Sequence, residues 1–527
     1  MDELTVLTHL APEDRARPAL VTDDRVWSFA ELAARAAGMA NRFESIGVRA
    51  GDRVALVAAP TPEVFVAIHA LVAMGATLVP IHPRLTPAEV HVTLDVARTQ
   101  HVLEASDIEL PPAEVAAGAG AGAGAQARWS LEGNETRGAS GERAHVGSAA
   151  PFAIVSTSGT TGRPKGAVLS RGAIVHSADA SARNLGWNED DRWLLAMPLA
   201  HVGGLSILTR CLVARRAVVL LPRFEPALVL EAIEKHRVTL LSVVPTMLRA
   251  LLEVDARGVL ARPRVVLLGG AAAPAALLDL CAERGVRALT TYGLTEACSQ
   301  VTAQAPRDPA VRLGGSGAPL AGFELRIVGD DGSPLAPAAI APAGAAGPDG
   351  AARPDGAVGL ASETGRIHIR GPALFDGYLA PDGSLDAARS ADGFFDTGDV
   401  GELDERGHLH VHVRRTDLIV TGGENVYPAE VEQALEGIPG VRRALVLGVP
   451  DERWGQVVAA VIEADTDSAP HADALLDVVS RSLAAHKRPR RYAIVDRLPL
   501  TTSGKVDRKD ALARFVALLR PLARAGS

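Results

Sequence analysis

Residues Thr157–Gly166 read TSGTTGRPKG and follow the apolar run Phe152–Val155. The apolar run predicts a buried strand, and a helical pattern opens soon after the loop, so the loop should lie at a strand end. Glycines and small hydroxyl residues let several backbone N–H groups and hydroxyls approach one anion, and Lys165 adds a mobile positive charge. The stretch therefore predicts a polyphosphate-binding loop. It lacks the Gly-x-x-x-x-Gly-Lys-Ser/Thr spacing of a Walker loop, and taken alone it is equally well explained as a surface turn.

Predicted strands and helices alternate along the chain, which indicates an α/β fold with mostly parallel sheets. A capping box of Ser28 and Glu31 begins an amphipathic helix that ends near Phe43. Further strands are predicted at 52–57, 76–80, 193–197, 217–221, 239–244 and 265–270, and further helices at 62–74 and 205–213. Because parallel strands end at one edge of a sheet, the loops after them should share a crevice.

Two stretches and one boundary divide the chain. The Ala/Gly-rich residues 111–148 and the Pro/Gly/Ala-rich residues 333–359 lack a core-forming pattern, so we expect flexible surface insertions there. A domain boundary is predicted after Arg414, because the chain then restarts with its own strand and helix. We therefore expect an N-terminal domain at 1–414 and an α+β C-terminal domain at 415–527.

Composition excludes several classes of protein. The 527 residues carry a formal net charge of −8, which argues against a general nucleic-acid or membrane-surface binder. Three scattered cysteines, Cys211, Cys281 and Cys298, form no CxxC pair and predict neither a zinc site nor a disulfide framework. The chain shows no signal peptide and no apolar run of the ~18 residues that a membrane span needs. We expect a cytoplasmic protein with small-molecule partners, and the sequence leaves open a homo-oligomer.

Five motifs stand out along the chain: TSGTTGRPKG at 157–166, TYGLTE at 291–296, DTGD at 396–399, GGENVYPAEVE at 422–432 and LTTSGKVDRK at 500–509. Together they resemble the adenylate-forming superfamily of acyl-CoA synthetases. They occur in the superfamily's order and span nearly the whole chain. The resemblance implies ATP, Mg²⁺ and coenzyme A as co-substrates and cofactor. It also implies a small C-terminal domain that rotates between adenylation of an acid and transfer of the acyl group to the thiol.

The resemblance assigns roles to single residues. Lys505 and Mg²⁺ would act as fixed cations on the α-phosphate, and Glu296 would be the magnesium carboxylate. Asp399 would hold the ribose with Arg414, and Tyr292 would stack on adenine. The expected catalytic residues are Lys505, Glu296, Thr161 and His201. The expected nucleotide-binding residues are Thr157, Ser158, Gly159, Thr160, Thr161, Gly162, Lys165, Thr291, Tyr292, Gly293, Thr295, Asp399 and Arg414.

The same resemblance places a hinge and a coenzyme A tunnel. The hinge should lie at Arg415, Thr416 and Asp417, although many family members have Asp or Lys where Thr416 stands. Gly422 and Gly423 should belong to a loop that swings in to wall the tunnel for the pantetheine arm.

Within the superfamily, the closest resemblance is to the o-succinylbenzoate:CoA ligases of menaquinone synthesis. It rests on residues 197–210, 243–248, 267–274 and 295–300. Arg210 lies nine residues after His201 on an otherwise apolar helix, and a buried arginine requires an anion. o-Succinylbenzoate offers a second carboxylate that a fatty acid lacks. The expected acid-binding residues are His201, Arg210, Gly269, Gly270, Ser299 and Gln300.

Several alternatives stay open at this point. Arg210 is also explained as one half of an ion pair inside the core, which would favour an aryl or medium-chain acyl-CoA ligase. His201 is also explained as a packed core residue, and Ala200 stands where family members usually carry an aromatic residue. An amino-acid adenylation module is disfavoured, because its amine-binding aspartate and carrier domain are missing. A non-catalytic ATP-binding protein is disfavoured because Lys505 and Glu296 are both present.

Overall fold

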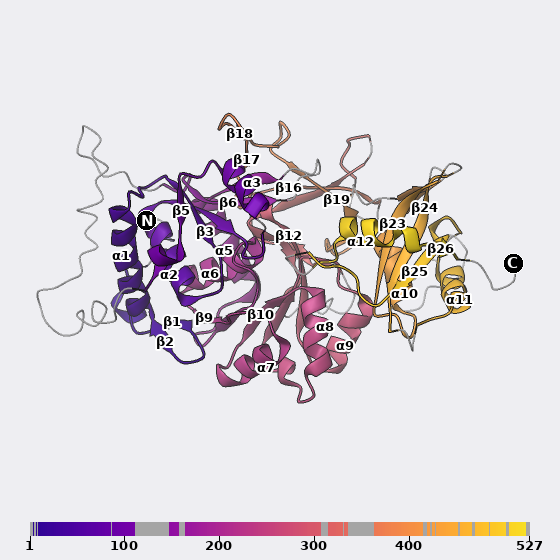
Figure 1. Cartoon of the computed structure of the whole chain (residues 1–527), viewed down its shortest axis with the longest axis horizontal. Helices are drawn as coiled ribbons and strands as arrows, with labels where there is room; N and C mark the ends of the chain where they lie inside the picture. Colours follow the sequence, from indigo (N-terminus) through magenta and orange to yellow (C-terminus); the bar gives the residue numbers. More distant parts are fainter. Residues whose placement is uncertain are drawn as a thin grey trace, which may run out of the picture.

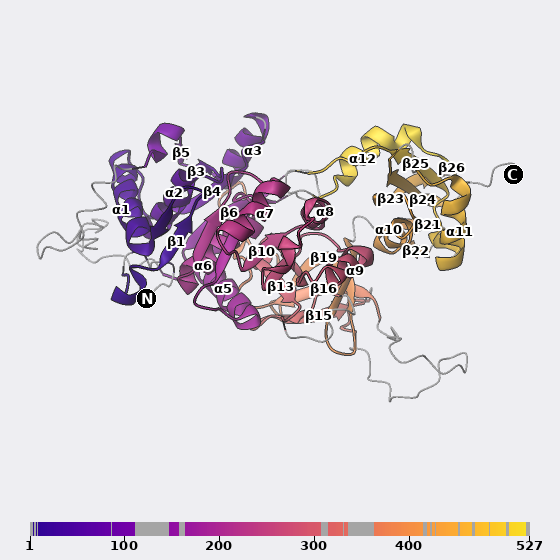
Figure 2. The same cartoon turned by 90° about the horizontal axis from the view of Figure 1, so that it is seen from below.

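A computed structural model gives the fold (Figures 1 and 2). It describes residues 4, 7, 9–85, 87–110, 147–157, 164–306, 315–329, 331–335, 363–414, 419–421, 424–426, 428–451, 454–465, 469–483, 485–501 and 505–522. Most of both predicted insertions, 111–146 and 336–359, lies outside these ranges.

A seven-stranded sheet carries the loop at 157–166. Its parallel strands are β3 (Arg53–Val57), β4 (Thr77–Ile81), β5 (His101–Leu103) and β6 (Pro151–Thr157). Antiparallel strands extend it, namely β7 (Lys165–Ser170), β17 (Gly377–Leu379) and β18 (Leu385–Asp386). The loop therefore connects two antiparallel strands, β6 and β7. The prediction of a strand followed soon by a helix missed β7, which is only six residues long and precedes helix α5.

A nine-stranded sheet forms the second layer. Its central strands are parallel: β1 (Pro18–Val21), β9 (Ala217–Leu220), β8 (Arg192–Leu195), β10 (Leu240–Val243), β11 (Val265–Leu268) and β12 (Ala288–Leu294). Antiparallel strands close both edges, namely β2 (Val26–Ser28), β13 (Ser299–Ala303) and β14 (Ala318–Pro319). The predicted mostly parallel α/β architecture is thus confirmed, with antiparallel strands at the margins.

Helices cover both faces of each sheet. Four of them lie between the two sheets: α1 (Phe29–Ser45), α2 (Pro62–Met74), α5 (Arg171–Leu185) and α6 (Val202–Ala214). The outer face of the nine-stranded sheet packs against α7 (Pro226–Lys235), α8 (Pro245–Val254) and α9 (Ala275–Glu283), and α3 (Pro87–Ala97) covers the other sheet. The predicted capping box is present, with Ser28 and Glu31 each bonding the other's backbone N–H at the start of α1.

Two further sheets complete the chain. The first contains β15 (Glu324–Val328), β16 (Gly365–Arg370), β19 (Phe395–Leu403) and β20 (Leu409–Arg414). The second contains β21 (Ile419–Thr421), β22 (Glu424–Val426), β23 (Arg443–Asp451), β24 (Gly455–Glu463), β25 (Arg491–Val495) and β26 (Arg520–Pro521). With α10 (Pro428–Glu436), α11 (Ala472–Ser482) and α12 (Arg508–Phe515), this last sheet forms a small domain with its own core, at the right in Figure 1.

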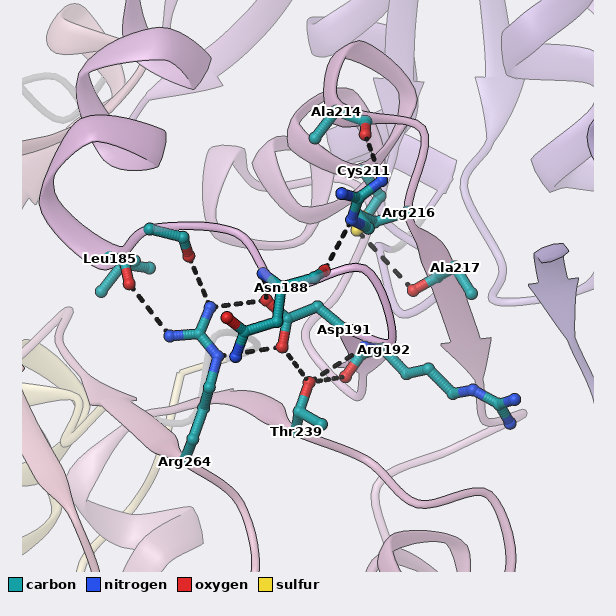
Figure 3. A network of polar contacts seen from close by, with 11 residues as sticks. Leu185, Asn188, Asp191, Arg192, Cys211, Ala214, Arg216, Ala217, Thr239 and Arg264 are labelled. Atoms are coloured by element: carbon teal, nitrogen blue, oxygen red, sulfur yellow. Dashed lines mark hydrogen bonds and ion pairs between the residues drawn. The ribbon is translucent and has the colours of Figure 1, made fainter. Parts of the chain in front are cut away.

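A buried polar network supports the nine-stranded sheet where β8, β10 and β11 begin (Figure 3). Asp191 is fully buried and accepts hydrogen bonds from Arg264, at 2.6 and 2.9 Å, and from Thr239, at 2.8 Å. The Arg264 guanidinium also donates to the carbonyl oxygens of Leu185 and Gly186 at the end of α5. Among the helices within the described ranges, none combines the length and apolar character that crossing a bilayer requires.

Candidate active site

The candidate site lies where the parallel strands of the nine-stranded sheet end. The chain leaves β8 toward His201, β10 toward Val244, and β11 toward Gly269 and Gly270. Since the strands are parallel, these segments meet at one edge of the sheet, as the sequence predicted. The other sheet contributes His82, directly after β4, whose ring centroid lies 5.5 Å from that of His201.

Lys505 of the small domain reaches this edge. A Cβ atom added to Gly270 would stand 3.5 Å from Lys505 Cε and 3.3 Å from Val244 Cγ1. Figure 2 shows the segment before α12 running from the small domain toward α8. The lysine predicted to be catalytic is therefore brought together with a predicted acid-binding glycine, although the two are far apart in the sequence.

His201 is a neutral imidazole in this environment. Burial lowers its pKa to about 4, and the nearby charges of His82 and Lys505 act in the same direction. Its buried Nε2 finds no hydrogen-bond partner among the described residues. His201 therefore offers a polar but uncharged atom at this edge of the sheet.

Three glycines allow the strand ends to approach each other closely. Gly270 has φ +79°, a conformation that disfavours side chains. A Cβ at Gly269 would lie 2.8 Å from Thr291 Cγ2, and one at Gly293 would lie 1.7 Å from the carbonyl oxygen of Ser299. Each glycine thus has a structural reason to be present, besides any contact with a ligand.

Glu296 and Lys165 meet through a third residue. Glu296 lies in the short helical turn Thr295–Ala297, and its Oε1 accepts a hydrogen bond from the Tyr378 hydroxyl at 2.6 Å. Lys165 Nζ lies 4.6 Å from the centroid of the same tyrosine ring. The predicted magnesium carboxylate and the predicted phosphate-binding lysine are therefore within one side chain's length of each other.

A second pair of predicted residues is joined directly. Asp399 in β19 accepts a hydrogen bond from the Tyr292 hydroxyl at 2.7 Å, and both side chains are buried. Residues 396–399, the DTGD motif, lie inside β19. The backbone of Arg414 pairs with that of Asp399 in the adjacent strand β20. The Thr157 hydroxyl donates to the carbonyl oxygen of Lys165 across the loop at 3.4 Å.

Some predicted residues cannot be placed. The side chain of Arg414 is not described, and the following predicted residues lie outside the described ranges: Ser158, Gly159, Thr160, Thr161, Gly162, Arg415, Thr416, Asp417, Gly422 and Gly423.

Arg210 in α6 is buried, and no ion pair joins it to a carboxylate of the described residues. It is 3% exposed, and neither Nε nor one of its terminal nitrogens finds a hydrogen-bond partner among the described residues. Its guanidinium carbon lies 5.5 Å from the centroid of the Trp193 ring. Burial lowers its pKa to about 10, so it stays positively charged at neutral pH. The alternative of an internal ion pair finds no carboxylate partner in the described part of the chain.

Polar groups of strand β13 lie close to α6. The Ser206 hydroxyl, one helical turn before Arg210, is 3.4 Å from the Ser299 hydroxyl. Ser299 has φ 112°, which costs a non-glycine residue of the order of 1–3 kcal/mol. Gln300 donates from Nε2 to the Thr291 hydroxyl at 3.1 Å, while its buried Oε1 lacks a partner among the described residues. Such strain and unsatisfied atoms concentrate at ligand sites.

Comparison with known proteins agrees with this geometry. The family model for the AMP-binding enzyme matches residues 7–379, and the model for the AMP-binding enzyme C-terminal domain matches residues 430–505. The chain belongs to the AMP-binding enzyme family. It is an adenylate-forming enzyme with a large N-terminal domain and a small C-terminal domain.

This AMP-binding enzyme has relatives that match it over almost their whole length. It is 36% identical to 2-succinylbenzoate–CoA ligase of Bacillus pumilus over 95% of this chain and 96% of that protein. The structure of o-succinylbenzoate CoA synthetase from Bacillus subtilis in complex with the acyl-adenylate intermediate OSB-AMP superposes with a TM-score of 0.77 at 32% identity, covering 96% of each chain. The complex of that synthetase with ATP and magnesium ion gives 0.76 at 32% identity, covering 96% of this chain and 98% of that chain.

Sequence reasoning missed three side chains of the AMP-binding enzyme's site. Tyr378 joins Glu296 to Lys165, Trp193 lies beside Arg210, and His82 lies beside His201. Each contact joins segments far apart in the sequence, and His82 and His201 even follow strands of different sheets. The signal available for Tyr378 was a lone aromatic residue between a glycine and a leucine, which carries no chemistry by itself.

Proposed function

We propose that this AMP-binding enzyme joins o-succinylbenzoate to coenzyme A in menaquinone biosynthesis. A carboxylate oxygen of the acid attacks the α-phosphorus of ATP and pyrophosphate leaves. The thiol sulfur of coenzyme A then attacks the acyl carbon, and AMP leaves. The proposal is supported by relatives that are named for this acid and that match over almost their full length.

The observation that carries the choice of acid is Arg210. A buried guanidinium with unsatisfied N–H groups is costly unless an anion meets it. o-Succinylbenzoate brings a second carboxylate to the site, and a planar guanidinium can bind it with two parallel hydrogen bonds. The Ser299 hydroxyl and Gln300 Oε1 and Nε2 lie on the neighbouring strand to orient the acid. His201 adds a neutral imidazole with an unpartnered Nε2 among the described residues.

The nucleotide fits the other half of the site. Lys505 and Lys165 supply positive charge for the phosphates, and Asp399, held by the Tyr292 hydroxyl, accepts hydrogen bonds from the ribose. In this role Tyr292 presents its ring to adenine while its hydroxyl stays bonded to Asp399.

A magnesium ion fits Glu296. Among the described residues, Oε2 of Glu296 accepts no hydrogen bond, so it is open to a cation. No group of three His, Cys, Asp or Glu side chains suited to a metal occurs within the described ranges. Mg²⁺ is commonly bound by one or two carboxylates together with substrate phosphates, so it does not need a cluster of protein ligands. When bound, the ion neutralises charge on the phosphates.

Rotation of the small domain completes the proposal. We take residues 1–414 and 415–527 as the two domains, with the hinge at Arg415–Asp417 and with Gly422 and Gly423 lining the coenzyme A tunnel. Lys505 beside Gly270 is the arrangement suited to adenylation, and a bulky thiol needs that space afterwards. A cross-link holding these two segments together should allow pyrophosphate release and block acyl transfer, whereas normal acyl transfer would contradict the rotation.

The function is tested by ATP-dependent pyrophosphate release, and by thioester formation with coenzyme A, over a panel of acids. The panel contains o-succinylbenzoate, benzoate, octanoate and several amino acids. The proposal predicts that kcat/KM is highest for o-succinylbenzoate. A preference for benzoate or octanoate would keep the chemistry and reject the acid.

A further inference from the structure

Tyr378 contacts both Glu296 and Lys165. Its hydroxyl donates to Glu296 Oε1 at 2.6 Å, and its ring faces Lys165 Nζ at 4.6 Å. The three residues come from strand β17, from the turn Thr295–Ala297 and from strand β7.

The segment around Tyr378 is rigid. The backbone of Tyr378 pairs with Ala167 in β7 and with Asp386 in β18, so it is held on both sides. Its ring centroid lies 4.8 Å from that of Phe375, which is fully buried. The N–H of Phe375 donates to the backbone carbonyl of Glu296 at 2.7 Å. One short segment therefore fixes both the backbone and the carboxylate of Glu296.

The two contacts act on different parts of nucleotide binding. A hydrogen bond to an ionised carboxylate is short and strong, so the phenol fixes the rotamer of Glu296 through Oε1 and leaves Oε2 to the metal. The face of an aromatic ring attracts an ammonium group, so the ring holds Lys165 near the same place. A glutamate side chain without such a partner samples several rotamers and must be ordered by the metal itself.

We propose that Tyr378 is a positioning residue that aims the Glu296 carboxylate at the magnesium ion of ATP and holds Lys165 beside it. This inference rests on the role given to Glu296 in the proposed function, but not on the identity of the acid. Partners that orient metal ligands commonly change metal affinity by 10- to 100-fold when they are removed.

The test measures binding rather than turnover. ATP affinity of Tyr378→Phe is measured by calorimetry without acid or coenzyme A, over a series of Mg²⁺ concentrations. Because the ring stays and the hydroxyl goes, we expect about a tenfold rise in the Mg²⁺ concentration that gives half of the metal-dependent gain in affinity. Metal-free ATP affinity should stay within twofold of the wild type. Tyr492→Phe, which removes a hydroxyl in the small domain, is the matched control and should change neither value.

A double-mutant comparison separates positioning from general structure. Glu296→Gln should itself abolish most of the metal-dependent gain, and adding Tyr378→Phe should then change ATP binding by less than twofold, because the carboxylate is already gone. An unchanged Mg²⁺ dependence in Tyr378→Phe would overturn the proposal. An equal loss of ATP affinity with and without Glu296 would also overturn it. Since no acid is present, a wrong choice of acid leaves this result unaffected.

Discussion

Lys505 of the small domain lies against Gly270 of the large domain, 3.5 Å from the position a Cβ of Gly270 would occupy. Strand β11 ends two residues before Gly270, at the edge where β8, β10 and β12 also end. A positive charge from one domain thus lies beside the strand ends of the other. The charge of Lys505 also acts to lower the pKa of His201, after burial and the charge of His82.

Replacing Lys505 by Ala should slow adenylation by a factor of about 10² or more, the scale for losing one preorganised charge at a developing anion. Acyl transfer from supplied acyl-adenylate to coenzyme A should be much less affected. Pyrophosphate release and thioester formation are measured separately, with Lys509→Ala as the control because Lys509 is exposed four residues further on. Equal losses in both half-reactions would remove Lys505 from the adenylation step.

Replacing Arg210 by Gln should raise the KM for o-succinylbenzoate by about 10²-fold, because the second carboxylate would lose a buried charged partner. The KM for benzoate, which has no second carboxylate, should rise far less. Steady-state kinetics with both acids check the ratio, and Arg183→Gln on the exposed face of α5 serves as the control. A ratio equal to that of the wild type would take Arg210 out of acid recognition.

Replacing Arg210 by Met should stabilise the free enzyme. The guanidinium is buried with unsatisfied N–H groups, and removing such a charge relieves a desolvation cost. We expect a rise of roughly 2–4 °C in the melting temperature without substrate, measured by calorimetry. An internal ion pair would reverse the sign, because Met would leave a carboxylate buried and unpaired.

Local patterns in the sequence predicted the elements well. Helix 62–74 has the predicted bounds, because a capping residue, a proline and apolar spacing act within a few residues. The common edge at which the strands end also followed from alternation of strands and helices. Lys505 and Glu296 stand inside motifs with a strong joint pattern, so the sequence could name them as candidates, and their catalytic roles stay predictions.

The contacts that the sequence could not predict join segments far apart in the chain. The contact between Tyr378 and Glu296 spans 82 residues, and no periodicity links the two segments. Strand β7 was missed because its strand conformation comes from antiparallel pairing with β6 and not from a local sequence pattern. Whether a carboxylate lies beside Arg210 is determined by all the elements that pack around it. Such facts are properties of packing, which the sequence encodes only through the whole fold.

The buried pair of Asp191 and Arg264 should be the main polar support of the nine-stranded sheet. Arg264→Ala would leave a buried carboxylate uncompensated, and we expect a loss of about 3–5 kcal/mol in the free energy of unfolding. Urea titration gives the change, and Arg183→Ala, which breaks an exposed pair with Asp179, should cost about 0.5 kcal/mol or less.

The pair of Asp191 and Arg264 should also make the stability of the protein depend on pH. Burial alone would raise the pKa of Asp191, but hydrogen bonds from Arg264, the Asn188 amide and Thr239 bring it below its ordinary value of 3.8. A depressed folded-state pKa means that this stabilisation is present above about pH 4 and is lost as the pH falls further. In Arg264→Ala the acid-induced loss of stability should therefore be smaller, and an identical acid profile would contradict this account.

Glu436, at the end of α10, should make the stability of the protein depend on pH with the opposite sign. Burial raises its pKa to about 7, and the nearby charge of Glu432 also raises it, while the Ala444 amide, Arg249 of the large domain and Arg443 act against this. Since the unfolded value is 4.5, the folded state favours the protonated form. Its contribution to stability is complete below about pH 4.5 and is lost as the pH rises through 7.

The variant Glu436→Gln keeps the shape of the protonated acid and removes its titration. It should raise the melting temperature at pH 8 by roughly 2–4 °C and leave it nearly unchanged at pH 5. Calorimetric melts at both pH values measure the difference, with Glu283→Gln on the exposed part of α9 as the control. Equal effects at pH 5 and pH 8 would mean that Glu436 stays ionised in the folded protein, paired with Arg249 across the two domains. A larger effect at pH 8 than at pH 5 would mean that deprotonation of buried Glu436 lowers the stability of the folded protein.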